Sequence, residues 1–214
     1  MQPLLMIATV SLLSAVLVPS SLIQAASSIQ DELTDIQEAL PMDQLEQLMA
    51  EYLVRDNQFR RTVRYMRGSE FADLWEQFEE VAKVKKMKDF MTSAGFPVSD
   101  VLETVKDILV GKKQPKIPKR KINKPQNGGL TAFAEEALNI ISSSEAVDLH
   151  KEKVRSNPDY KSMTKKLQSD EFQTILQDAF NDSKVKSLRK KILNHGIDIN
   201  LLSNMIKSYI DWND

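Results

Sequence analysis

The chain has 214 residues, of which 42% are hydrophobic and 28% charged, with no Cys, two His and six Gly. The absence of cysteine excludes a disulfide scaffold, a thiolate metal site and a cysteine nucleophile, and two histidines are too few for a multi-histidine metal centre. Few glycines also argue against turn-rich β folds and phosphate-binding loops. The composition indicates a helical protein with little catalytic inventory, and we expect neither a metal nor a cofactor.

The chain begins with an uncharged apolar run at residues 4–18, which is followed by Pro19 and then by the small residues Ala25 and Ala26. This order is typical of a secretory signal peptide, which we assign to residues 1–25. A membrane anchor is the alternative, but the run is shorter than the ~20 residues that span a bilayer. We therefore expect a secreted, extracellular protein, in which Asn181 would be a candidate glycosylation site.

Apolar residues then recur at helical spacing, and we expect six short helices of about 10–13 residues within 29–110. Asp56 and Ser69 stand where N-caps are needed, and Gly95 where a helix should stop. The same order returns 101 positions later without a gap, so that Glu70-Phe71 aligns with Glu171-Phe172 and Gly95 with Gly196. This register predicts two tandem repeats, at 29–110 and 130–210, that bury their apolar faces against each other.

Charge is divided unevenly along the chain. The first repeat carries ten basic and 17 acidic side chains, the segment 111–129 carries seven basic and no acidic ones, and residues 130–214 carry 12 basic and 13 acidic. The middle segment holds three prolines, so we expect an exposed basic linker, open to trypsin-like cleavage at Lys119-Arg120-Lys121. No aromatic residue interleaves its basic run, and we expect no nucleic-acid binding.

No catalytic motif stands out in the sequence. His195 precedes Gly196 at an expected helix end, where its ring would interact with the terminal carbonyls. His150 lies among Asp148, Lys151 and Glu152, as on a solvated helix face. We therefore predict that the protein is not an enzyme.

The apolar residues are more informative. Several helices show wide apolar faces, and seven methionines remain after the leader. Wide faces belong to helices contacted on two sides, and flexible Met side chains suit a surface that accepts varied ligands. Periodicity alone does not distinguish a packed core from a hollow one.

The segments 40–45 (LPMDQL) and 51–56 (EYLVRD), with Phe59, Tyr65-Met66, Ser69-Glu70-Phe71 and Gly95, resemble the insect allergen-related repeat family. That family includes the cockroach group 1 allergen, insect midgut microvillar proteins and nitrile-specifier proteins. The resemblance implies an all-α capsule of two repeats around an apolar cavity that holds fatty acids or similar lipids, in a protein of the insect gut lumen. Candidate cavity residues are the apolar ones at matched positions: Leu48, Leu53, Val63, Met66, Leu74, Phe78, Met87, Met91, Val105, Leu167, Ile175, Leu188, Ile192 and Ile206.

The leading hypothesis is thus a secreted, non-enzymatic, allergen-like protein that binds apolar small molecules such as lipids. Two alternatives remain open at this stage. The first is a structural or interaction protein of the gut microvillar or peritrophic surface, with a packed core and peripheral membrane association. The second is a specifier-type detoxification protein that acts on dietary plant toxins. The sequence does not indicate an oligomeric state.

Overall fold

The computed structural model describes residues 28–100, 102, 128–202 and 204, and all regular structure in these ranges is helical. The fold is therefore all-α, as predicted. Helix bounds in chain order are α2 (Ser28–Glu38), α3 (Met42–Arg55), α4 (Asn57–Met66), α5 (Ser69–Glu79), α6 (Ala82–Ser93), α8 (Gly129–Ser142), α9 (Glu145–Ser156), α10 (Pro158–Leu167), α11 (Asp170–Asn181) and α12 (Ser183–Leu193). The sixth helix expected in the first repeat is helical at 98–100 and 102, and its remainder lies outside the described residues, as do the leader and most of the linker.

The helices recur at the spacing of 101 residues that the sequence suggests. α4 and α10 correspond over their whole length, and α2, α5 and α6 begin 101 residues before α8, α11 and α12. Gly95 and Gly196 both have left-handed backbones, with φ of 94° and 82°, which end α6 and α12 at equivalent positions. The two segments thus share one local structure although few of their residues are identical.

The two segments do not fold side by side as separate bundles. α2 of the first packs on α9 and α10 of the second, and in return α8 packs on α3 and α4. The fifth helices also pack across the repeats: α6 packs chiefly on α11, and α12 packs on α5 as well as on α11 of its own repeat. Each structural half therefore consists of the second, third and fourth helices of one repeat and the first and fifth helices of the other.

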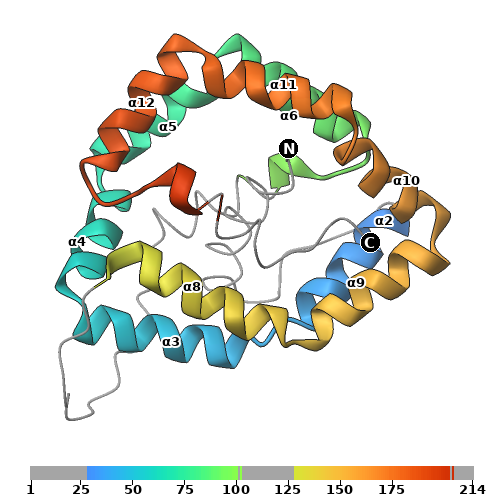
Figure 1. Ribbon diagram of the computed structural model, residues 1–214, viewed down its shortest axis with the longest axis horizontal. Coiled ribbons are helices and arrows are strands. Elements are labelled where there is room, and N and C mark those ends of the chain that lie inside the picture. Colours follow the sequence, from blue (N-terminus) through green and yellow to red (C-terminus); the bar gives the residue numbers. More distant parts are fainter. Residues whose placement is uncertain (1–27, 101, 103–127, 203, 205–214) are drawn as a thin grey trace.

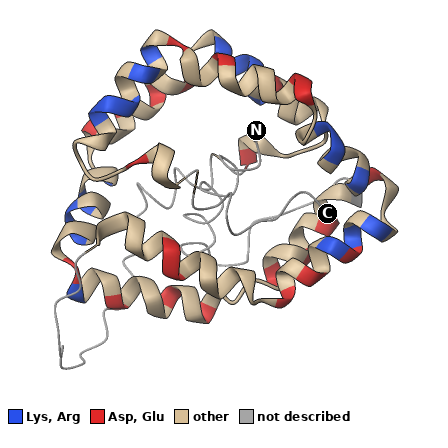
Figure 2. Ribbon diagram, viewed as in Figure 1, with Lys and Arg blue, Asp and Glu red and all other residues tan. Residues whose placement is uncertain are grey.

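These pairs are arranged as a ring, with α4 and α10 at opposite ends (Figure 1). α3 runs beside α8 and α2 beside α9 along one side of the ring, while α5 with α12 and α6 with α11 form the other side. The five basic side chains of α12 contribute to the positive charge on that second side (Figure 2). None of the described helices is long and apolar enough to cross a bilayer.

Two equivalent joints hold the exchanged first helices. Asp56 caps α4 by accepting from the backbone N–H groups of Gln58 (2.7 Å) and Phe59 (2.9 Å), which confirms its predicted role. Its second oxygen accepts from the N–H of Gly129 (2.9 Å), so that one fully buried carboxylate satisfies the N-termini of both α4 and α8.

In the other joint, Asn157 caps α10 and its amide donates to Glu32 of α2 (2.7 Å). A second contact accompanies each cap. The Tyr52 hydroxyl donates to Glu136 (2.6 Å), and the equivalent pair is an ion pair between Lys153 and Asp35 (2.6 Å).

The other expected N-cap, Ser69, is wrong. Ser69 is the first residue of α5 rather than its cap; Gly68 occupies the cap position, and no side chain bonds to the helix N-terminus there. In the second repeat it is Ser169, one residue before the aligned Asp170, that caps α11 through the N–H of Phe172 (3.3 Å).

Buried side chains gather in two clusters, one in each half of the ring. We name them the α3–α8 cluster and the α6–α11 cluster. The α3–α8 cluster contains Leu45, Leu48, Met49, Tyr52, Phe59, Val63, Met66, Leu130, Phe133, Ala134, Ala137, Ile197 and Leu202. The α6–α11 cluster contains Val81, Val84, Met87, Met91, Ala94, Phe96, Val98, Leu102, Tyr160, Met163, Leu167, Phe172, Ile175, Leu176 and Val185. Each cluster draws on both repeats, so neither repeat has a complete core of its own.

Candidate functional site

Twelve of the 14 predicted ligand-binding residues lie in the described part of the chain, and Val105 and Ile206 lie outside it. The predicted residues are divided between the two clusters. Leu48, Val63 and Met66 belong to the α3–α8 cluster, with Leu53 and Ile192 half-buried against it. Met87, Met91, Leu167 and Ile175 belong to the α6–α11 cluster, with Phe78 half-buried against it. Leu74 and Leu188 are buried on α5 and α12, and Asn181 is exposed at the end of α11.

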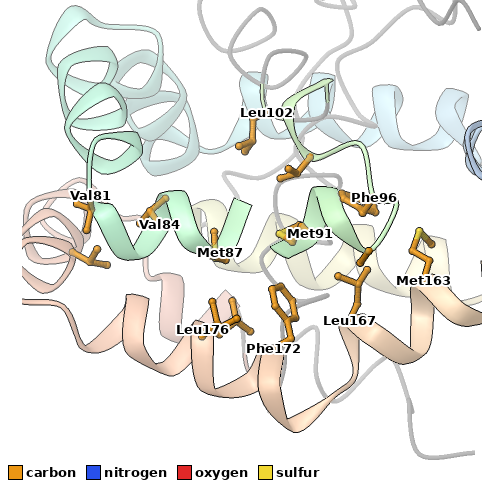
Figure 3. Close-up of a cluster of buried hydrophobic side chains, with 14 of the residues drawn as sticks. Val81, Val84, Met87, Met91, Phe96, Leu102, Met163, Leu167, Phe172 and Leu176 are labelled. Atoms are coloured by element: carbon orange, nitrogen blue, oxygen red, sulfur yellow. The ribbon is translucent and has the colours of Figure 1, made fainter. Parts of the chain in front are cut away.

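The α6–α11 cluster is closely packed in its centre (Figure 3). Met87 and Met91 of α6 lie opposite Leu176 and Phe172 of α11, and each of the four is at most 3% exposed. Phe172 is also stacked on Phe90, with ring centroids 4.9 Å apart. These residues pack against one another and offer almost no surface that a ligand could contact.

Such surface occurs on α5, where three aromatic residues form a stripe at i, i+4 and i+7. Phe71, Trp75 and Phe78 are all half-buried, and successive ring centroids are 6.2 Å apart. Trp75 contacts both clusters, so the stripe bridges the two halves of the ring.

The equivalent residues of α11 are Phe172, Leu176 and Ala179, and all three are buried. The two repeats therefore differ here. The first keeps large aromatic rings with accessible surface at positions where the second has a closed core. Phe71 and Trp75 are not among the predicted ligand-binding residues. Their helical spacing is visible in the sequence, but their half-buried state depends on neighbouring helices that the sequence does not place.

A polar group marks one end of this aromatic stripe. The Tyr65 ring packs edge-on against Phe71 at 5.8 Å and is stacked on the imidazole of His195 at 3.5 Å. The Tyr65 hydroxyl is buried and has no hydrogen-bond partner among the described residues. Burial, and secondarily the charge of Glu70, raise the pKa of this hydroxyl, so that it remains a neutral donor. A buried donor without a partner is unusual in proteins, so the Tyr65 hydroxyl is free to donate a hydrogen bond to a bound acceptor.

His195 differs from expectation. Its ring is stacked on Tyr65 and lies 3.8 Å from Glu70, rather than interacting with the carbonyls at the end of α12. Its own carbonyl oxygen instead accepts from the Thr62 hydroxyl (2.8 Å), and this bond ties the end of the second repeat to α4.

A second polar group of side chains lies between α2, α9 and α10. Lys153, 7% exposed, donates to both Glu32 and Asp35. Burial alone would lower the pKa of Lys153, but the hydrogen bonds to Asp35 and Glu32 outweigh it and the pKa lies above its ordinary value. Hydrogen bonds from Lys153 and Asn157 hold the pKa of Glu32 below its ordinary value.

His150 belongs to the same region, and its expected position on a solvated face is wrong. Its Nδ1 is 2.8 Å from the buried Tyr160 hydroxyl, and burial, with a contribution from Lys151, lowers its pKa. Lys153 and Asn157 join the exchanged helix α2 to α9 and α10, and His150 joins α9 to α10, which indicates a structural role for this group. No group of three or more His, Asp or Glu side chains suited to a metal ion occurs among the described residues.

The chain is similar in sequence to known proteins over most of its length. A curated relative, Protein G12 of Anopheles gambiae, is 26% identical over 203 residues, which cover 93% of this chain and 96% of that protein. The family model described as "Insect allergen related repeat, nitrile-specifier detoxification" matches residues 28–203, a range that includes all ten helices described above. The chain belongs to the insect allergen-related repeat family.

Proposed function

We propose that the protein binds apolar or amphiphilic small molecules, with fatty acids and related lipids as the leading class, and that the aromatic stripe of α5 is part of the binding surface. We further propose that it does so as a secreted protein of the insect midgut. The observation that carries the binding proposal is the half-buried stripe of Phe71, Trp75 and Phe78, which contacts both clusters of buried side chains. Covering such surface stabilises a complex by ~25 cal/mol per Å² of apolar area removed from water.

The Tyr65 hydroxyl supports an amphiphilic ligand over a pure hydrocarbon. It lies at the end of the stripe with an unused donor. A carboxylate or carbonyl of the ligand would accept that hydrogen bond while an acyl chain covers Phe71 and Trp75. The bond would contribute about 0.5–1.5 kcal/mol, and somewhat more to a charged acceptor.

Titration with a fluorescent fatty acid tests the proposal. The double variant Trp75→Leu/Phe78→Ala gives α5 the residues that α11 carries at the equivalent positions, and so should fold. Each ~55 Å² of apolar protein surface that the ligand no longer covers weakens binding about tenfold, and we expect at least that reduction. Glu76→Gln, on an exposed position of the same helix, is the matched control and should bind as the wild type does.

Tyr65→Phe tests the polar end separately. It keeps the ring on Phe71 and removes only the hydroxyl, so affinity for a fatty acid should fall about fivefold while affinity for an uncharged alkane probe stays constant. Lipid extraction followed by mass spectrometry is the direct measurement. A native protein that carries no apolar molecule and does not bind the fluorescent probe would refute the proposal and favour a packed structural protein.

The family description gives one reason to test a second function. It names nitrile-specifier detoxification, so a specifier role in glucosinolate breakdown is the alternative candidate. The assay compares the products of glucosinolate hydrolysis with and without the protein. An unchanged product distribution removes this alternative and leaves the binding proposal as it stands.

A further inference from the structure

The ends of α6 and α12 form equivalent corners of the ring, and their exposed side chains differ in charge and polarity. In the first repeat the corner lies around the end of α6, and its exposed residues include Asp89, Thr92 and Asp100. Lys88 of α6 forms an ion pair with Glu79 at 2.8 Å. This corner is polar and carries charges of both signs.

The equivalent corner of the second repeat, which we call the α12 corner, consists of Phe180, Arg189, Lys190, Leu193 and Leu201. Each lies 101 residues after one of the five residues just named. Arg189 lies over the Phe180 ring, with its guanidinium carbon 5.1 Å from the centroid, and also donates to Asn200. The acid–base pair of the first repeat is thus a cation–π pair here, and Asp100 is replaced by a leucine.

Two leucines at the α12 corner are exposed to solvent. Leu193 is 50% exposed and Leu201 is 43% exposed, whereas most large hydrophobic side chains of the described residues are buried or half-buried. Leu193 follows Arg189 by four positions and Lys190 by three, so these three side chains share one face of α12. The bond from Arg189 to Asn200 places Leu201, the next residue, at the same corner.

The corner is also strongly basic. α12 carries Lys184, Lys186, Arg189, Lys190 and Lys191 and no acidic residue. The structure places none of these five in an ion pair with a carboxylate of the described residues, whereas Lys85 and Lys88 of α6 are paired with Glu80 and Glu79. Figure 2 shows the Lys and Arg positions along α12 in blue.

We propose that the α12 corner docks the protein onto an anionic lipid bilayer. The lysines and Arg189 would bind lipid phosphates and carboxylates, and Leu193 and Leu201 would enter the headgroup region. Basic side chains flanking exposed leucines are the composition of interfacial membrane-binding surfaces, and a soluble polyanion would have no use for the leucines. The inference does not depend on the aromatic stripe of α5.

Flotation with lipid vesicles tests the proposal on the purified full-length protein. Vesicles of phosphatidylcholine with 30% phosphatidylserine are compared with vesicles of phosphatidylcholine alone. Each basic side chain near an anionic surface is worth about 1 kcal/mol, so Lys186→Gln/Lys190→Gln should weaken partitioning roughly 30-fold. Leu193→Ser/Leu201→Ser should weaken it on the order of tenfold or more.

The control is Lys83→Gln/Lys86→Gln, which removes two exposed charges from α6 and should change partitioning less than threefold. All variants share the same N-terminus, so residues 4–18 contribute equally in every comparison. Equal binding to both vesicle types, or an equal loss in the α6 control, would overturn the assignment. Retention on heparin without binding to anionic vesicles would also overturn it, in favour of a soluble polyanion.

Discussion

Replacing Lys153 by Met tests whether the polar joint holds the exchanged helix α2. Lys153 is 7% exposed and is the donor to both Glu32 and Asp35 of that helix. Met keeps an unbranched apolar side chain of similar length at position 153. The packing of α2 against α9 and α10 should therefore survive while the two charge-assisted bonds are removed.

The magnitude follows from the exposure of the partners. Removing one member of a buried ion pair costs about 3–5 kcal/mol, because the other charge is left without compensation. Here the side chains of Asp35 and Glu32 are 58% and 22% exposed, so water reaches the carboxylates once the amine is gone. We therefore expect a loss of roughly 2–3 kcal/mol in the free energy of unfolding. In a chain of this size that lowers Tm by about 5–10 °C.

Urea and thermal unfolding at pH 7, followed by circular dichroism at 222 nm, measure both quantities. The double variant Asp35→Glu/Lys153→Tyr is the informative companion, because it builds into this joint the hydrogen bond that Tyr52 makes with Glu136 in the other (2.6 Å). We expect it to recover most of the lost stability. A Lys153→Met protein within 0.5 kcal/mol of wild type would refute the view that this joint stabilises the exchange, since about 0.5 kcal/mol is the range of neutral surface substitutions.

Four further outcomes are expected. The stabilisation from Glu32, whose pKa is lowered in the folded protein, should be complete above its ordinary pKa of 4.5 and lost as the pH falls through the folded-state value, so Glu32→Gln should flatten the acid limb of a stability–pH curve. Asp56→Ala, which leaves two helix N-termini without their acceptor, should cost about 2–4 kcal/mol by urea unfolding, against about 1–2 for Asn157→Ala. Gly196→Ala should destabilise more than Gly68→Ala by thermal unfolding, because φ is 82° at Gly196 and a Cβ there would lie 2.9 Å from the Thr62 hydroxyl oxygen. Limited trypsin cleavage at Lys119-Arg120-Lys121 should leave two fragments that co-elute on gel filtration, and separate elution would contradict the reciprocal packing of the repeats.

The sequence predicts local structure well because local signals determine it. The apolar stripes, the Asp56 cap and the glycine at positions 95 and 196 act over a few residues, and the structure shows each where it was expected. The exchange of helices was not predictable, since a stripe on α2 says that a face is buried but not that α9 covers it. His150 was misplaced for the same reason: its neighbours in sequence are polar, whereas Tyr160, one helix further on, buries it.

The candidate site was predicted only in part. Matched apolar positions led to Met66 and Leu167, which the structure buries in different clusters. The half-buried aromatic surface of α5 includes only one predicted residue, Phe78, together with Phe71 and Trp75. Phe71 has the same residue at its equivalent, Phe172, whereas Trp75 and Phe78 correspond to Leu176 and Ala179. Matching apolar positions between the repeats therefore finds their common framework, but it does not find Trp75, whose equivalent is Leu176.

Because helices are exchanged between the repeats, the partners of α2 are synthesised long after α2 itself. Lys153 lies 121 residues after its partner Glu32, and at about 5–20 residues per second a ribosome needs roughly 6–24 s to make that interval. During this time the apolar face of α2, which includes Ile29, Leu33 and Ile36, lacks the two helices α9 and α10 that pack on α2 in the folded protein. The nascent first repeat therefore exposes apolar surface that favours aggregation, and mutations that slow the appearance of α9 should lower yield even where the finished protein is fully stable.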